Sequence, residues 1–296
     1  MTVVIVSYNT CTHLQRCLET IPPHSLYTVV VVDNGSTDGS IEMVRQSYPH
    51  VTLMVLPENQ GYGGASNQAL LAATTPYALL LNSDTLLAPD TIPALIDYLE
   101  QHPQAAIVGP RLSNQDGTLQ PSCYPFPTPW YLFLEESALW QVAQWIPLLK
   151  ERYWRTWSHD RSRQVPWVLG AVLAMRCEAF QQVQGFDPAF FMYYEEVDLC
   201  YRLTQAQWQI HFAPVTEVMH VGGASTAAYR PAMLLTLYQS MVRYYRTHYG
   251  TVALYGMHGV MTVILGLRFL RDVILKKPQN RDVWKQALSA LYQDGT

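Results

Sequence analysis

Three carboxylates lie within four residues of each other, directly after a run of bulky apolar and aromatic side chains. The run is Phe190–Tyr194, and the carboxylates are Glu195, Glu196 and Asp198. Neighbouring carboxylates beside apolar side chains raise one another's pKa, which suits a general base. The alternative is an acidic first turn of a helix, where the helix dipole favours negative charge. In a helix Glu195 and Asp198 share a face and Glu196 points elsewhere, so at most one or two of them can face one substrate atom.

A second cluster, Asn82-Ser83-Asp84, follows the apolar run at 78–81. A carboxylate at the tip of a buried strand can hold Mg²⁺ or Mn²⁺ against a diphosphate, because these ions take oxygen ligands and share them with substrate phosphates. The alternative is that Asp84 caps the next helix, although that helix is expected to begin near Asp90. The sequence therefore makes Asp84 a candidate metal ligand.

Two more polar clusters follow the first two expected strands. They are Ser7-Tyr8-Asn9 and the segment from Asp33 to Asp38. The carboxylate of Asp33 is placed to accept a hydrogen bond from the ring N–H of a nucleobase, whereas the alternative is ordinary turn and capping chemistry. A nicotinamide or flavin site would instead need a glycine-rich turn after the first strand, and none is present there.

The stretch from Asn59 to Asn67 is rich in glycine and includes Gly61. Such a loop opening a helix can present backbone N–H groups to phosphate or sugar oxygens, and it can equally be a flexible turn. It lacks the Lys-Ser/Thr pair of a P-loop. His220 lies among apolar residues before Gly222-Gly223; a histidine in such surroundings is more often a core residue than a ligand, although the glycines permit close backbone approach.

The elements that must position these clusters alternate regularly along the first 110 residues. Strands are expected at 3–8, 28–32, 51–56, 77–81 and 105–108, and helices at 10–21, 38–48, 64–73 and 90–101. This alternation predicts a mostly parallel sheet with helices on both faces. Ligands bind such sheets beyond the carboxyl ends of the strands, where the clusters lie.

The second half of the chain is less regular. Prolines and tryptophans interrupt residues 111–166, so we expect a long excursion of loops and short helices over the active site. Further on, a strand is expected at 167–175, helices at 178–184 and 195–205, and two short strands at 208–212 and 215–220. Gly185 is expected to end the first of these helices.

Charge divides the chain into an acidic body and a basic tail. Residues 1–229 hold 10 Lys and Arg against 20 Asp and Glu, whereas residues 230–296 hold 9 Lys and Arg against 3 Asp. The acidic body argues against nucleic acid as a partner. The basic tail fits an anionic lipid surface or, equally, a solvated helix face.

The tail is expected to be helical throughout. Residues 251–267 contain no Lys, Arg, Asp or Glu over 17 residues, but a membrane-spanning helix needs about 20 apolar residues. Because this stretch also holds His258 and several glycines, we expect a helix that lies on the membrane or packs on the body rather than one that spans.

The compartment is expected to be the cytoplasm. The five cysteines are an odd number without metal-ligand spacing, which favours a reducing environment. A buried-strand pattern begins at Val3, with no basic segment of a signal peptide before it.

Taken in order, these clusters resemble glycosyltransferase family 2, and within it the bacterial rhamnosyltransferase-like enzymes of cell-surface polysaccharide synthesis. The matching stretches are Val4–Asn9, Val31–Asp38, Asn59–Asn67, Leu80–Thr85, Gly170–Met175, Gly185–Leu203 and Val218–Ser225. Each motif is weak alone, but seven in the same order are specific.

The resemblance implies a GT-A fold, an α/β architecture with a Rossmann-like, mostly parallel central sheet, here followed by a C-terminal helical tail. It implies inverting transfer of a sugar such as rhamnose from a dTDP- or UDP-linked donor to a glycan or lipid-linked acceptor. The residues that would bind the nucleotide sugar are Ser7, Asn9, Asp33, Ser36, Gly61, Asn67, Asn82 and Asp84.

The resemblance also assigns the metal and the base. Asp84 and His220 would hold Mg²⁺ or Mn²⁺, with the neutral Asn82 contributing less at the first position of the Asp-x-Asp motif. Glu196 falls on the second member of the family's Glu-Asp pair and would be the base, with Glu195 and Asp198 as alternatives.

The expected domains are 1–229, the GT-A domain, and 230–296, the basic and apolar tail. Within the first, 1–110 would bind the nucleotide and 111–229 would hold the acceptor side and the catalytic residues. The alternative from another class is a nucleotide-sugar-binding or scaffold protein without catalysis. A nucleotidyltransferase would carry a glycine-rich loop with a basic residue after the first strand, which the sequence lacks.

Overall fold

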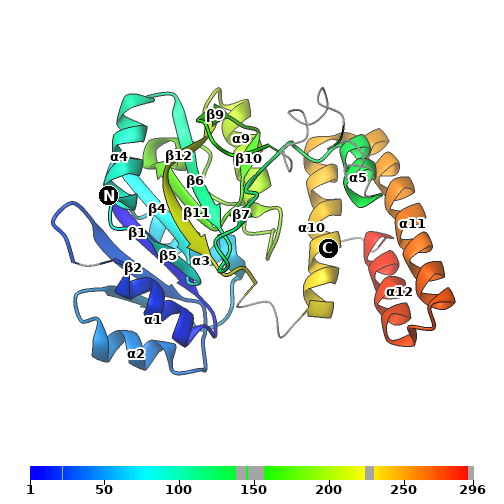
Figure 1. Ribbon diagram of the computed structural model, residues 1–296, viewed down its shortest axis with the longest axis horizontal. Helices are drawn as coiled ribbons and strands as arrows, with labels where there is room; N and C mark the ends of the chain where they lie inside the picture. The colour runs from blue at the N-terminus through cyan, green and yellow to red at the C-terminus, as the bar shows by residue number, and fades with distance from the viewer. Residues whose placement is uncertain (22, 138–144, 146–156, 224–229, 293–296) are drawn as a thin grey trace. The chain divides into compact units, whose positions relative to one another are not determined.

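The computed structural model describes residues 1–21, 23–137, 145, 157–223 and 230–292. The chain divides into two compact units (Figure 1). The first comprises Met1–Tyr124, Ser158–Phe191 and Glu195–Ala227, and the second comprises Pro125–Trp157, Met192–Tyr194 and Ala228–Thr296.

A mixed sheet forms the centre of the first unit, with strand order β3-β2-β1-β4-β11-β6-β12-β5. The strands on this path are β1 (Thr2–Ser7), β2 (Thr28–Asp33), β3 (Thr52–Val55), β4 (Tyr77–Asn82), β5 (Thr85–Leu87), β6 (Ala105–Ser113), β11 (Val172–Arg176) and β12 (Gln209–His220). Pairing is parallel among β3, β2, β1 and β4 and between β6 and β12. The apolar, β-branched runs of the early strands are buried on both faces, as parallel strands require.

Short strands extend this sheet or lie beside it. β7 (Leu119–Gln120) pairs with β6, and β9 (Arg163–Gln164) pairs with β12. β8 (Cys123–Tyr124) and β10 (Trp167–Val168) form a separate two-stranded sheet. The excursion expected at 111–166 therefore contributes strands to the first unit, while its Trp140 and Trp154 lie outside the described residues.

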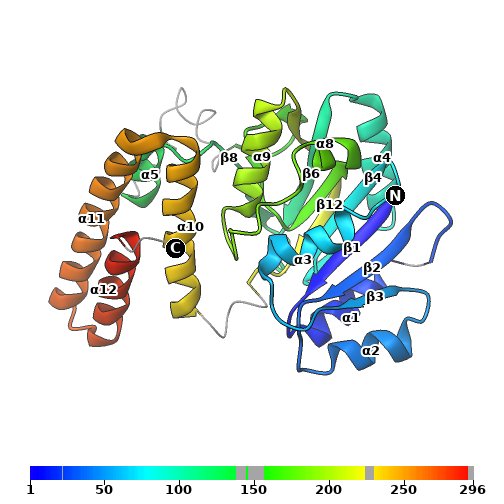
Figure 2. The same ribbon diagram turned by 180° about the vertical axis from the view of Figure 1, so that it is seen from behind.

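Helices cover both faces of the sheet. They are α1 (Cys11–Glu19), α2 (Ser40–Ser47), α3 (Gly61–Leu70), α4 (Thr91–Gln101), α8 (Cys177–Gln182) and α9 (Glu195–Gln205). Figures 1 and 2 show α1 and α4 on one face and α3, α8 and α9 on the other. On the first face Leu14 of α1 and Leu95 of α4 share one core cluster with Ile5 and Leu81 of the sheet. The amphipathic spacing of the helices thus determines which side of each helix packs on the strands.

The strand register brings the polar clusters to one edge. Ser7 pairs with Asp33, and Val6 pairs with Asn82, so β1, β2 and β4 end at the same level. At the β5 side of the sheet, the last residue of β12, His220, pairs with Thr85 at the start of β5. Because Thr85 directly follows Asp84, this pairing places the histidine beside the aspartate.

Three expectations differ from the structure. The single strand expected at 167–175 is interrupted around Gly170 and forms β10 and β11 in different sheets. The two strands expected at 208–212 and 215–220 are one strand, β12, which shifts register between Phe212 and Glu217. Pro214 within that shift cannot donate a ladder hydrogen bond, so the strand accommodates it as an irregularity instead of ending. The strand expected at 105–108 continues to Ser113.

Four helices make up most of the described part of the second unit. They are α5 (Pro129–Glu136), α10 (Arg230–His248), α11 (Gly250–Ile274) and α12 (Pro278–Tyr292). Gly250 has a φ of +73°, which lets the chain turn between α10 and α11, and α12 begins at Pro278, where proline is tolerated. Tyr244 and Tyr245 are fully buried in this unit.

Among the described residues, α11 is the helix that is long and apolar enough to cross a membrane. It has 25 residues and an 18-residue window of mean hydropathy 1.5, of which only 28% is buried. Length and composition alone do not distinguish a spanning helix from one that lies in a membrane surface.

Candidate active site

Asp84 and His220 form a buried pair where β4 and β12 end. The distance from Asp84 Oδ1 to His220 Nε2 is 3.3 Å, and Asn82 Nδ2 lies 3.3 Å from the same nitrogen. The backbone N–H of Gly222 donates to Asp84 Oδ2 at 3.1 Å. Gly222 has a φ of +79°, so glycine permits this approach of the backbone.

A glutamine that the sequence analysis did not identify orients His220. Gln120 Oε1 lies 2.7 Å from His220 Nδ1, and Gln120 Nε2 donates to Asn114 Oδ1 at 3.0 Å. Because the glutamine oxygen can only accept, Nδ1 carries a proton, and in the neutral imidazole Nε2 is then the nitrogen with the lone pair. No local signal marks Gln120, since only the pairing of β7 with β6 brings it there.

These residues fit a divalent cation. A carboxylate is a usual ligand of Mg²⁺ and Mn²⁺, an imidazole nitrogen is a ligand that transition metals accept more readily than Mg²⁺ does, and the hydrogen bond to the far nitrogen of the histidine is typical of metal sites. In the part of the chain that the structure describes, no cluster of three or more His, Cys, Asp or Glu forms a complete cage. Two protein ligands suffice where substrate phosphates and water complete the coordination.

The loops after β1 and β2 are locked together beside Asp33. Asp33 Oδ1 accepts a hydrogen bond from the backbone N–H of Ser36 at 2.8 Å, and Ser36 Oγ accepts one from the N–H of Asn9 at 3.0 Å. Asn9 Oδ1 in turn accepts from the N–H of Thr37 at 2.8 Å. Asp33 Oδ2 is buried and has no hydrogen-bond partner among the described residues. A buried carboxylate oxygen without a donor is costly, so this atom marks a place for a ligand N–H.

Two of the expected nucleotide-binding residues hold protein groups. Ser7 is fully buried, and its hydroxyl lies 3.0 Å from that of Thr10, which lies 2.8 Å from Ser83 Oγ. The amide of Asn67 donates to the carbonyl of Phe186 at 2.8 Å and accepts from the N–H of Phe186 at 2.9 Å. Both side chains therefore connect elements around the site.

The glycine-rich segment brings α3 against the chain that leads to α9. Gly61 has a φ of +75°, and a Cβ there would lie 2.2 Å from the carbonyl oxygen of Phe191. That carbonyl accepts a hydrogen bond from the N–H of Tyr62 at 3.0 Å. The helix begins at Gly61, three residues before the expected start. Only glycine fits at this position, because any Cβ would collide with the Phe191 carbonyl.

Asn34 holds the same segment from the other side and was also missed from the sequence. Its Nδ2 donates to Asn59 Oδ1 at 2.9 Å and to the carbonyl of Gly61 at 3.1 Å, and its Oδ1 accepts from the N–H of Gln60 at 2.8 Å. In the sequence, the Asn-Gly pair at 34–35 indicates only a turn, so the contacts of Asn34 with residues 59–61 could not be predicted from it.

Glu196 lies against Gly170 at the start of α9. Its Oε1 accepts a hydrogen bond from the N–H of Gly170 at 3.4 Å, while the hydroxyl of Tyr62 donates to the Gly170 carbonyl at 2.7 Å. The neighbouring N–H of Asn82 donates to the carbonyl of Ala171 at 2.9 Å, which connects this segment to the end of β4. The Oε2 atom of Glu196 is buried and has no partner among the described residues.

Burial determines the protonation of the glutamate pair. Burial raises the pKa of Glu196. The pKa of Glu195 is raised well above its usual range, first by burial and then by the charge of Glu196. Burial therefore favours the protonated form of both carboxyls, and the charge of Glu196 favours it further in Glu195.

The chain enters α9 through two consecutive residues in the left-handed region, Tyr193 with a φ of 67° and Tyr194 with a φ of 66°. Residues other than glycine rarely adopt this backbone conformation, and such strain often occurs at functional sites. It turns the backbone sharply before Glu195.

Asp198 is engaged in an ion pair. Its Oδ2 lies 2.7 Å from Arg202 Nη2, and Arg202 also donates to the carbonyls of Val183 and Gly185. The buried aspartate therefore holds α9 to the loop before it, where Gly185 ends α8 with a φ of +72°.

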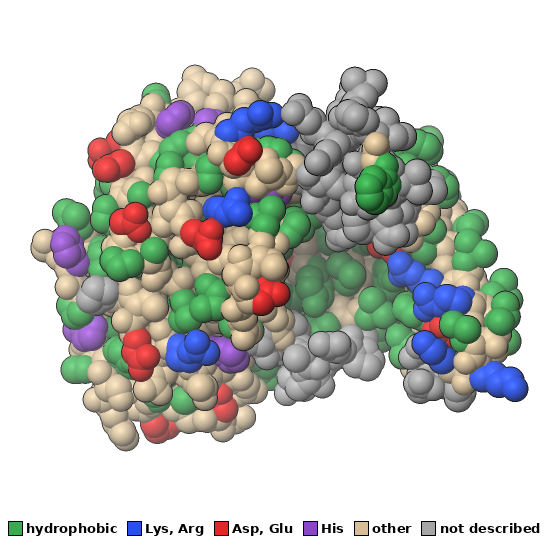
Figure 3. Space-filling model, viewed as in Figure 1, with side chains coloured by type: hydrophobic (Ala, Val, Ile, Leu, Met, Phe, Trp, Pro, Cys, Tyr) green, Lys and Arg blue, Asp and Glu red, His purple; other side chains and the backbone are tan. Residues whose placement is uncertain are grey.

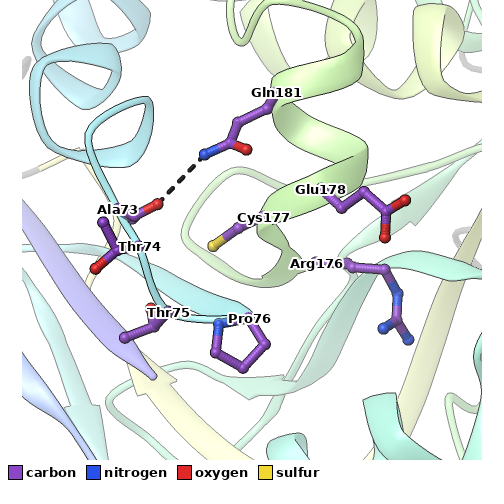
Figure 4. Close-up of a pocket in the computed structure, with 8 residues that line it drawn as sticks. All are labelled: Ala73, Thr74, Thr75, Pro76, Arg176, Cys177, Glu178 and Gln181. Carbon is purple, nitrogen blue, oxygen red and sulfur yellow. Dashed lines mark hydrogen bonds between the residues drawn. The ribbon is translucent and has the colours of Figure 1, made fainter.

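A separate hollow of about 550 Å³ lies at the opposite end of the sheet (Figure 4). Thr75, Pro76 and Arg176 line it, and Arg176 pairs with Tyr77 at the amino end of β4. Since Asn82 is at the carboxyl end of the same strand, this hollow is not part of the site around Asp84.

A mixed sheet with parallel strands β3, β2, β1 and β4, an Asp84–His220 pair at the carboxyl end of β4 and a buried glutamate pair on α9 fit the GT-A fold of sugar transferases. Solved structures agree with this fold. A mannosyltransferase of Pyrobaculum calidifontis in complex with GDP-Man and Mn²⁺ has a TM-score of 0.55 at 17% identity, covering 98% of this chain and 85% of that one. Staphylococcus aureus TarS in complex with UDP-GlcNAc has a TM-score of 0.54 at 15% identity, covering 98% and 80%.

The sequence comparisons name the family. The family described as "Glycosyltransferase like family 2" matches residues 1–247. An N-acetylglucosaminyl-diphospho-decaprenol L-rhamnosyltransferase of Mycobacterium tuberculosis is 34% identical over 245 residues, covering 76% of each chain. The rhamnosyltransferase WbbL of Escherichia coli is 25% identical over 226 residues, covering 74% of this chain and 82% of that one. The chain belongs to glycosyltransferase family 2, as the sequence resemblance predicted, and is a glycosyltransferase.

Proposed function

We propose that this protein transfers rhamnose, with inversion, from a dTDP- or UDP-linked donor to a hydroxyl of a glycan or lipid-linked acceptor. The observation that carries the proposal is the pair of buried, unpartnered carboxylate oxygens, Asp33 Oδ2 and Glu196 Oε2, at the edge that also holds Asp84 and His220. The two named rhamnosyltransferase relatives support the choice of sugar.

The nucleotide would be held by its base at Asp33. Uracil and thymine carry a ring N–H that can donate to the free Oδ2 atom, while Oδ1 is occupied by Ser36. Asn9 and Ser36 keep the two loops in place. Ser7, through its bond to Thr10, and Asn67, through its bonds to the backbone of Phe186, would keep the surrounding elements in place.

Asp84 and His220 would hold Mg²⁺ or Mn²⁺, with Asn82 as a neutral neighbour. When bound there, such an ion would supply positive charge opposite the diphosphate. Gln120 keeps the Nε2 lone pair of His220 available, and the N–H of Gly222 fixes the second oxygen of Asp84.

Glu196 would be the general base. The acceptor hydroxyl forms a bond to the anomeric carbon as the bond from that carbon to the diphosphate oxygen breaks, and the hydroxyl proton passes to Glu196. Attack comes from the face opposite the diphosphate, so the configuration inverts. Glu195, whose raised pKa favours the protonated form, and Asp198, which is paired with Arg202, would position α9 rather than accept the proton.

We further propose that residues 1–229 form the transferase domain, with a nucleotide-binding half at 1–110 and an acceptor-side catalytic half at 111–229. The tail at 230–296 would contact the inner face of the cytoplasmic membrane. The Mycobacterium tuberculosis relative, a rhamnosyltransferase named for a decaprenol-linked substrate, supports a lipid-linked acceptor and a role in cell-envelope polysaccharide synthesis. Nucleic acid is not expected as a partner.

The test compares Glu196→Gln and Asp84→Ala with the parent protein, using dTDP-rhamnose and a polyprenyl-diphospho-N-acetylglucosamine acceptor with Mn²⁺. We expect Glu196→Gln to lower kcat by about 10²- to 10⁴-fold, the usual contribution of a general base. Glu217→Gln is the matched control. Glu217 is half-exposed, and in the described part of the chain its carboxylate forms an ion pair with Arg111. Parent-like rates in both site variants would refute the proposal.

The alternative is a nucleotide-sugar-binding or scaffold protein without catalysis. A thermal shift with the donor, but no transfer or donor hydrolysis with Mn²⁺, would favour it. The anomeric configuration of the product, read by NMR, tests inversion separately.

A further inference from the structure

One face of α11 is apolar along its whole length and is exposed. Six side chains on this face, which we call the α11 apolar face, are each more than half exposed: Val252, Tyr255, Val263, Leu267, Leu270 and Ile274. Their successive spacings of three, four and eight residues place them on one side of the helix, and Gly259 lies on the same side. No charged residue interrupts this face between residues 252 and 270.

The opposite face of the same helix packs in the second unit. Met257, Met261 and Leu265 are buried, and α11 contacts α12, α10 and α5. Near the end of this buried face Asp272 Oδ2 accepts a hydrogen bond from Trp284 Nε1 at 2.9 Å. The six side chains of the α11 apolar face therefore lie outside the core of the unit. Apolar patches of this kind mark interaction surfaces.

Basic side chains lie beside the α11 apolar face, and Figure 3 shows Lys and Arg side chains next to hydrophobic ones on this part of the molecule. Arg271 is exposed at the C-terminal end of α11, and Lys276 and Lys277 are exposed in the turn that follows it. Residues 230–296 hold 9 Lys and Arg against 3 Asp. The charge favours an anionic surface as the occupant.

An exposed tryptophan extends the apolar surface. Pro129 at the start of α5 lies 3.4 Å from the position of a Cβ on Gly256, which places the neighbouring Trp130 beside α11. Trp130 is 66% exposed and stacks on Phe133, with 5.7 Å between the ring centroids. Tryptophan is enriched at the level of lipid headgroups.

We propose that the α11 apolar face docks in the plane of an anionic lipid bilayer, with its basic neighbours at the level of the headgroups. A helix in this position buries its apolar face about 5 to 10 Å into the boundary between headgroups and acyl chains. This inference deepens the proposed function, on which its purpose rests, because a lipid-linked acceptor is available only at a bilayer.

The packing of α11 argues against a spanning arrangement. The helix contacts α10 and α12. The exposed side of α12 carries Lys285 and Gln286, and that of α10 carries Arg243 and Arg246. Insertion of α11 across the hydrocarbon would bring these side chains with it or break the packing, at a high free-energy cost. Docking in the plane leaves them in water.

The experiment measures binding of the full-length protein to vesicles of phosphatidylglycerol and phosphatidylcholine, and to vesicles of phosphatidylcholine alone, by flotation. We expect binding to the anionic vesicles and weaker binding to the neutral ones. Leu267→Asp with Ile274→Asp is expected to lower the partition at least tenfold. The matched control is Gln239→Asp with Gln286→Asp, which adds the same charge at exposed positions of α10 and α12 and is expected to change it less than threefold.

Four results would overturn the inference. The first is equal binding by the double-aspartate variant and its control, and the second is no vesicle binding by the parent protein. The third is a parent dimer that the double-aspartate variant dissociates without lipid, which would make a second copy the occupant of the face. The fourth is resistance to alkaline carbonate extraction from vesicles, which would indicate spanning.

Donor binding distinguishes failure of this inference from failure of the proposed function. A thermal shift with dTDP-rhamnose depends on the first unit, so it is expected to be the same in the parent, the double-aspartate variant and the control. Loss of vesicle binding with donor binding retained supports the docking face independently of the donor site. Vesicle binding that is unchanged between the two double variants overturns the docking face whatever the donor result.

Discussion

Replacing Gly61 with alanine should damage both stability and catalysis, and Gly39→Ala provides the matched control. Both glycines lie in the first unit with positive φ, +75° and +87°. A Cβ at Gly61 would lie 2.2 Å from the oxygen and 2.8 Å from the carbon of the Phe191 carbonyl, whereas a Cβ at Gly39 meets nothing within 4 Å. The two variants therefore share the conformational strain and differ only in the collision.

The magnitudes follow from that difference. The left-handed conformation costs either alanine about 1 to 2 kcal/mol. At Gly61 the Phe191 carbonyl must also move, which weakens its 3.0 Å hydrogen bond from Tyr62, worth about 1 kcal/mol, and strains the packing by about 1 to 3 kcal/mol. Gly61→Ala should thus lower the free energy of unfolding by about 2 to 4 kcal/mol more than Gly39→Ala does.

Catalysis should respond to the same displacement. Phe191 lies four residues before Glu195, so a moved carbonyl shifts the start of α9 and its glutamates. A misplacement of about 1 Å can reduce a rate by about 100-fold, and we expect a loss of this order in kcat for Gly61→Ala and little change for Gly39→Ala. Denaturant unfolding and steady-state transfer assays measure the two effects. Equal destabilisation by both alanines would refute the argument from close approach.

Two further predictions concern the site. Glu195→Gln removes a group whose raised pKa lets the folded protein keep a proton that the unfolded chain loses above its ordinary pKa of 4.5. The free energy of unfolding of the parent should therefore fall as the pH rises from about 4.5 toward the raised pKa. Over that range the variant should become more stable relative to the parent. A difference between the two free energies of unfolding that stays constant from pH 4 to pH 8 would contradict this. Gln120→Leu should weaken Mn²⁺ binding, measured by calorimetry, by about 10- to 100-fold, because the Nδ1 proton of His220 loses its acceptor. Gln120→Glu keeps an acceptor and should retain binding, so unchanged affinity in the leucine variant would show that the hydrogen bond has no such role.

The sequence predicted what depends on local pattern. The apolar runs of β1, β2 and β4 identify buried strands, and the polar residues after them lie at the carboxyl edge because parallel strands end together. Asp84 and His220 were both singled out, and the structure brings them within 3.3 Å. Their metal-binding role stays a prediction.

The features that were missed depend on pairing across long sequence distances. β11 inserts antiparallel between β4 and β6, and no periodicity within residues 172–176 could indicate that direction. Gln120 reaches His220, 100 residues away, only through such pairing. Asn67 resembles a sugar-binding amide in sequence, but both of its polar groups bond the backbone of Phe186, 119 residues further on.

The separation of Asp84 from His220 has a consequence for synthesis of the chain. The residues around Asp33 pair within β1–β4, which lie in the first 82 residues, whereas His220 joins Asp84 across 136 further positions. At about 5 to 20 residues per second, the ribosome needs roughly 7 to 27 s to make that intervening chain. The loops around Asp33 can thus form on the nascent chain well before the proposed cation site is complete.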